Sequence, residues 1–152
     1  MRSEAERVQI ADHLMYELAM LWGTSRLLGS SSSKVLNNSV VEGMALHARN
    51  LIDFFYTAPQ QDDVAATHFF SDPHVWPRVR PACPTVLQEA KTRANKEISH
   101  LTYTRLLVTP DDKEWPVGAI IEALDAALDV FCERADLLPE RIKLLRYRDL
   151  LP

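Results

Sequence analysis

The sequence predicts an all-α fold, a bundle of four or five helices that run up and down. Apolar residues recur at intervals of three and four over several long stretches, which places them on one face of a helix. No stretch alternates apolar and polar residues as a half-buried strand does. With 152 residues, 47% of them hydrophobic and 25% charged, the chain has the size and composition of one globular domain, residues 1–152.

The first two helices are expected to form an antiparallel hairpin. Within residues 1–29 one stripe recurs at helical spacing: Ala11, Leu14, Leu18, Leu21, Ser25 and Leu28. Gly29 and the serines at 30–33 end this N-terminal helix. A second stripe follows: Val41, Met44, Ala48, Leu51 and Phe55. Asn37 or Asn38 is the expected N-cap of this second helix. Two helices cannot bury both stripes by themselves, so further helices are expected to pack on them.

A long proline-rich connection separates the second helix from the third. Between residues 58 and 84 five prolines interrupt the helical pattern: Pro59, Pro73, Pro77, Pro81 and Pro84. Within it, "DDVAATHFF" predicts a short helical turn with Asp62 or Asp63 as its cap and Phe69 and Phe70 as its anchors. Connections of this length are usually functional or carry ordered pieces of their own. The large apolar residues favour ordered pieces here.

Two more helices follow, and then a basic tail. The third helix starts with Pro84 in its first turn and shows one apolar face: Leu87, Ala90, Ala94, Ile98 and Leu101. The fourth starts at Pro116 and continues with Val117, Ile120, Ile121, Leu124, Leu128 and Phe131. The tail, residues 140–152, mixes arginines with leucines. It is expected to form a last short helix or an extended arm, which grips RNA or, as we prefer, docks on a second subunit.

Composition and motifs argue against several classes of protein. The N-terminus is charged and then amphipathic, and no apolar run approaches 18 residues, so we expect no secretion signal and no membrane span. Two distant cysteines predict reduced thiols in the cytoplasm. The four glycines are isolated and form no phosphate-binding loop. His68 and His74 lack a second ordered pair of ligands, so we expect neither a metal nor a cofactor.

The stretch "RANKEISHLTYTR" carries the polar residues that are most suggestive of chemistry. It lies in residues 76–108, which hold 6 basic and 2 acidic residues although the whole chain has a net charge of −4. On an ideal helix Arg93 and His100, seven positions apart, share one flank about 10 Å apart along the axis, whereas Asn95 falls on the other flank. Histidine can move protons near neutral pH, and arginine can hold a phosphate with two hydrogen bonds. Two such pairs across a two-fold axis would supply both proton transfers of metal-free RNA cleavage.

Arg93, six intervening residues and His100, late in a helical bundle, resemble the signature of the HEPN superfamily (higher eukaryotes and prokaryotes nucleotide-binding). The phrases "HARNLIDFFY" and "DDVAATHFF" are also similar to abortive-infection-type members and bacterial relatives. The resemblance covers residues 35–135 by helix order. It implies a dimeric, metal-independent endoribonuclease of toxin or phage-defence type, which cleaves RNA by 2′-hydroxyl attack and pairs with a cognate antitoxin protein. The chain departs from the commoner pattern at Ala94, where a polar residue usually follows the arginine.

The resemblance assigns catalytic roles to Arg93, Asn95 and His100, and we add Lys96, His47 and Asn50 as candidates for contacting substrate. Each has a structural alternative. Arg93 and Glu97, four residues apart, can form an ion pair, and His100 can bond the last carbonyls of its helix. His47 and Asn50 can satisfy loop backbone. The competing function is a non-catalytic helical module that binds a partner, a nucleotide or RNA.

Overall fold

All of the regular structure in the described part of the chain is helical. The computed structural model describes residues 3–98, 103, 106, 109 and 114–139. Its elements are α1 (Glu4–Leu27), α2 (Lys34–Tyr56), the 3₁₀ turn η1 (Ala66–Phe69), α3 (Val75–Val79), α4 (Thr85–Arg93), the π-helical turn η2 (Ala94–Ile98) and α5 (Val117–Arg134). These residues contain no strand, so the predicted all-α class is confirmed. None of the described helices is long and apolar enough to cross a membrane.

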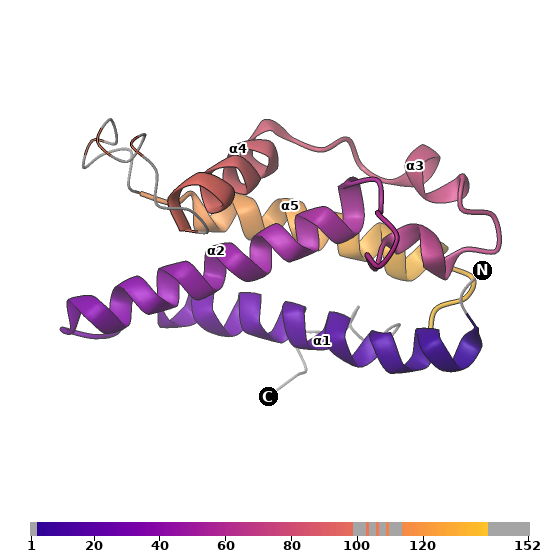
Figure 1. Ribbon diagram of the computed structural model, residues 1–152, viewed down its shortest axis with the longest axis horizontal. Helices are drawn as coiled ribbons and strands as arrows, with labels where there is room; N and C mark the ends of the chain where they lie inside the picture. Colours follow the sequence, from indigo (N-terminus) through magenta and orange to yellow (C-terminus); the bar gives the residue numbers. More distant parts are fainter. Residues whose placement is uncertain (1–2, 99–102, 104–105, 107–108, 110–113, 140–152) are drawn as a thin grey trace.

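Helices α1 and α2 lie side by side as a long antiparallel hairpin, and α5 packs against α2 (Figure 1). Helix α1 begins with a reciprocal cap, because the Ser3 hydroxyl accepts the Glu6 N–H while the Glu6 carboxylate accepts the Ser3 N–H. Gly29 has a φ of 70°, a backbone conformation that glycine adopts without strain, and it helps the chain turn into α2.

The second helix begins earlier than the sequence predicted. Ser33 is the N-cap, since its hydroxyl accepts a backbone N–H from the first turn of α2. The prediction of a cap at Asn37 or Asn38 is therefore wrong. The Asn37 amide instead bridges back across the loop, donating to the Ser31 carbonyl at 2.6 Å and accepting from the Ser31 N–H at 3.3 Å.

An aromatic cluster around α5 holds the bundle together. Phe131 is completely buried, and its ring centroid lies 5.4–6.1 Å from those of five other rings: Phe54, Phe55, Phe69, Phe70 and Trp76. The Trp76 indole N–H also donates to the Phe55 carbonyl at 2.7 Å. The cluster therefore ties α2, η1 and α3 to α5, and it anchors two ordered pieces of the connection between α2 and α4.

The helical turn predicted within residues 62–70 is present, but neither aspartate caps it. It follows Ala65, and Asp63 instead closes a separate turn with Gln60. The Gln60 N–H donates to the Asp63 carboxylate at 2.8 Å, and the Asp63 N–H donates to the Gln60 carbonyl at 3.2 Å. This turn therefore fixes the position of the Asp63 carboxylate.

Candidate functional site

The predicted site begins where α4 ends and the chain enters the π-helical turn. The Arg93 guanidinium donates from Nε and Nη2 to the two carboxylate oxygens of Glu97, at 3.0 and 3.2 Å. Its Nη1 donates to the Glu114 carbonyl at 2.9 Å, and Cζ lies 4.3 Å from the centroid of the Trp115 ring. Arg93 therefore clamps η2 to the segment that leads into α5.

The other predicted catalytic residues occupy different positions. Asn95 and Lys96 lie in the π-helical turn, and Ala94 beside them is buried. The ideal helix assumed for this stretch is wrong over Ala94–Ile98, because a π turn uses i to i+5 hydrogen bonds and so takes more residues to complete each turn. His100 lies outside the described residues. The structure thus places Arg93 and Asn95 but leaves the predicted pair of Arg93 with His100 as a prediction.

His47 and Asn50 share one partner on the neighbouring helix α1. His47 Nδ1 lies 2.8 Å from the Glu17 carboxylate, and the Asn50 amide donates to the same oxygen at 3.0 Å. The Tyr16 ring meets the His47 ring edge to face at 5.6 Å. These contacts join α1 to α2, so the structural partner of the two residues is a carboxylate rather than loop backbone.

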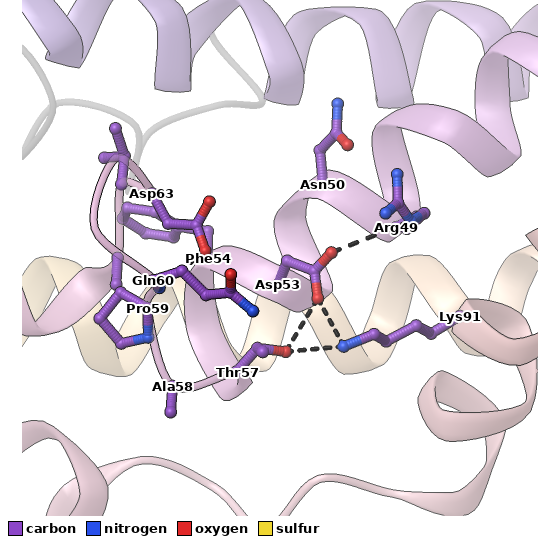
Figure 2. Close-up of a pocket in the computed structure, with 12 residues that line it drawn as sticks. Arg49, Asn50, Asp53, Phe54, Thr57, Ala58, Pro59, Gln60, Asp63 and Lys91 are labelled. Carbon is purple, nitrogen blue, oxygen red and sulfur yellow. Dashed lines mark hydrogen bonds and ion pairs between the residues drawn. The ribbon is translucent and has the colours of Figure 1, made fainter. Parts of the chain in front are cut away.

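A cavity of about 540 Å³ opens between the C-terminal half of α2, the loop that follows it and Lys91 of α4. Figure 2 shows its charged lining, with Arg49 and Lys91 to one side and the loop of Asp63 to the other. Asp53 and Thr57 lie between the two sides in the same view. The volume is within the range of small-molecule sites.

Asp53 is the centre of a hydrogen-bonded network in this cavity. It pairs with Lys91 Nζ at 2.5 Å and accepts the Thr57 hydroxyl at 2.8 Å, and Lys91 also donates to Thr57 Oγ1 at 2.8 Å. Arg49 Nε is 3.9 Å from Asp53, which is an ion pair without a hydrogen bond. Arg49 Nε is buried and has no hydrogen-bond acceptor among the described residues.

Sequence reasoning singled out none of Arg49, Asp53 and Lys91. The spacing of four residues from Arg49 to Asp53 and from Asp53 to Thr57 was visible, because such residues are neighbours on a helix surface. The contact with Lys91 spans 38 positions in sequence, from residue 53 to residue 91, and depends on how α4 packs against α2. No local pattern predicts a contact of that kind.

The half-buried Cys83 thiol near this region does not have the lowered pKa that activates a cysteine nucleophile. Burial raises the pKa of the Cys83 thiol, and the positive charges of Arg80 and Lys91 lower it only in part. Burial likewise raises the pKa of Tyr56, whose ring lies 5.2 Å from the Arg80 guanidinium carbon. Nucleophilic cysteines have a lowered pKa. Among the residues that the structure describes, no group of three or more His, Cys, Asp or Glu side chains is placed to hold a metal ion.

Comparisons of the chain with protein families, with curated proteins and with solved structures find no match. The function must therefore be argued from the contacts themselves.

Proposed function

We propose that the protein is a non-catalytic helical interaction module, in which α4 and its π-helical turn serve as scaffold. The observation that carries this proposal is the engagement of Arg93. Three of its nitrogen atoms already donate to acceptors of the protein, and its planar face rests on Trp115. An arginine held in this way ties two segments of a fold together.

The same contacts oppose a role for Arg93 in holding a phosphate. A bidentate phosphate contact needs two parallel N–H donors, and the matching pair on Arg93 faces Glu97. An incoming phosphate would have to displace that carboxylate and would also be repelled by its negative charge. The Arg93 side chain is 21% exposed, so water screens this repulsion only partly.

A metal-independent endoribonuclease of toxin or phage-defence type is the second candidate. It is favoured by the spacing of Arg93 and His100 and by the π-helical turn between them, since π turns are frequent at functional sites. In that function Arg93 would hold the scissile phosphate, His100 would transfer protons and Asn95 would orient them. RNA would bind at a cleft shared by the two subunits of a homodimer, and an antitoxin protein would inhibit the enzyme.

Incubation of the purified full chain with mixed cellular RNA in EDTA distinguishes the two functions. The wild type is compared with His100→Ala, purified in parallel, and circular dichroism confirms that both are folded. The module predicts that both proteins leave the RNA intact. Light scattering on the same samples gives the molar mass, and the module does not require a dimer.

Cleavage by the wild type alone, with fragments ending in 2′,3′-cyclic phosphate, would overturn the module and establish 2′-hydroxyl chemistry that depends on His100. Equal cleavage by both proteins that disappears on further purification would indicate a contaminating nuclease. Equal cleavage that stays with the purified protein would also overturn the module and would assign proton transfer to a group other than His100.

A further inference from the structure

The cavity beside α2 offers a cation whose hydrogen-bonding capacity the fold does not use. Arg49 has five N–H donors in a planar fork, and none of them bonds to an acceptor among the described residues. Its Nε is buried, although the side chain as a whole is 34% exposed. A guanidinium with one buried edge and one open edge is suited to an acceptor that enters from the cavity.

Asp53 does not accept a hydrogen bond from the Arg49 guanidinium. Lys91 and the Thr57 hydroxyl both contact the Asp53 oxygen Oδ1, whereas Arg49 stays 3.9 Å from Oδ2. The negative charge of Asp53 is therefore balanced first by Lys91. Within the described part of the chain, no carboxylate lies at hydrogen-bond distance from the positive charge of Arg49.

On the opposite side of the same cavity, the fold itself holds the carboxylate of Asp63 in position. Asp63 is held by its two hydrogen bonds with Gln60, which use its backbone N–H and its Oδ2 atom. Its other carboxylate oxygen makes no hydrogen bond among the residues that the structure describes, and Asp63 lines the cavity. An ammonium or another strong donor would find an acceptor there.

We propose that this cavity binds a compact zwitterion, with a carboxylate or phosphate group on Arg49 and an amino group on Asp63. Guanidinium groups pair with both kinds of oxyanion through two parallel hydrogen bonds. A polyanion such as an RNA strand is a poorer fit, since the carboxylates of Asp53 and Asp63 would repel its successive phosphates. The volume of about 540 Å³ is also that of a small-molecule site.

A series of ω-amino carboxylates of increasing length, from glycine to 6-aminohexanoate, measures the separation of the two ends. Each is titrated into the ¹⁵N-labelled full chain, and NMR follows the Arg49 Nε–H and the backbone amides of residues 60–65. Alkyl carboxylates of the same lengths lack the amino group, and inorganic phosphate tests the oxyanion alone. We expect saturable shifts at one chain length, and roughly tenfold weaker binding by the matched alkyl carboxylate.

Four variants assign the two ends of the ligand. Arg49→Gln should abolish the shifts, and Arg49→Lys should weaken binding roughly tenfold, because lysine keeps the charge but loses the planar fork. Asp63→Asn should remove the advantage of the amino group. Arg78→Gln, a change at an exposed arginine of α3 outside the cavity lining, should bind as the wild type does.

Two outcomes would overturn the proposal. One is that Arg49→Gln, shown to be folded by its amide spectrum, gives the same shifts as the wild type. The other is that neither phosphate nor any member of the series binds more tightly than about 10 mM, which is weaker than a paired zwitterion site should be. The titration measures ligand binding in this cavity only. A negative titration would therefore leave the result of the RNA cleavage assay unaffected.

Discussion

Replacing Arg93 with alanine is expected to destabilise the fold by about 2 kcal/mol. The change removes the stacking on Trp115, the bond to the Glu114 carbonyl and the pair with Glu97 together. It tests whether Arg93 is bound as firmly in solution as its contacts indicate. The answer bears directly on which of the two functions is correct.

The magnitude follows from three contributions. A cation over an aromatic ring contributes about 0.5–2 kcal/mol. A hydrogen bond from a charged donor contributes about 1.5–3 kcal/mol, less where water competes, and an ion pair at a spacing of four residues about 0.3–0.5 kcal/mol. The three share one side chain that is 21% exposed, so they are not additive, and about 2 kcal/mol is the expected total. For 152 residues this lowers Tm by roughly 4–8 °C.

Urea unfolding followed by circular dichroism measures the change. Arg93→Lys, which keeps the charge without the planar fork, should lose about half as much stability. Arg78→Ala, at an exposed arginine, should stay within about 0.5 kcal/mol of the wild type. If Arg93→Ala also stays within about 0.5 kcal/mol of the wild type, the contacts of Arg93 with Glu97, Glu114 and Trp115 do not hold the fold together in solution. A phosphate-binding role for Arg93 is then the better explanation.

Two further changes test other contacts by the same unfolding measurement. Glu17→Ala should lower the free energy of unfolding by about 1–3 kcal/mol, because it leaves the buried His47 without its partner. Glu17→Gln keeps an acceptor and should lower it less. Equal losses for the two variants would contradict this explanation. Hydrogen bonds from Ser71 lower the pKa of Asp136 from 3.8, so the carboxylate stabilises the fold above that pH and loses its effect as the pH falls through the lowered value. The stability difference between wild type and Asp136→Asn should therefore shrink below pH 3.8, and a difference that does not depend on pH would refute it.

The helices were predictable because their signal is local. Four of the residues in the first predicted stripe, Ala11, Leu14, Leu18 and Leu21, are the buried residues of α1. Helix starts were harder, since several nearby side chains can cap and only one does. Ser33 takes that position while Asn37 closes the preceding loop. The short helix Val75–Val79 was missed altogether, because its place is decided by Trp76 packing against distant aromatic rings rather than by a periodic pattern.

The candidate site shows the same division between local and long-range information. Sequence spacing singled out Arg93, and it also offered the ion pair with Glu97 as an alternative; that pair is present. It gave no indication of Trp115, which comes from a different segment and occupies the face of the guanidinium. Arg49 carries the same side chain on a neighbouring helix, yet it has no hydrogen-bond acceptor at its buried Nε among the described residues. Whether an arginine is available to a ligand depends on which acceptors the fold brings to it, and these come partly from residues far away in the chain. By that criterion a small anion should bind more tightly at Arg49 than at Arg93.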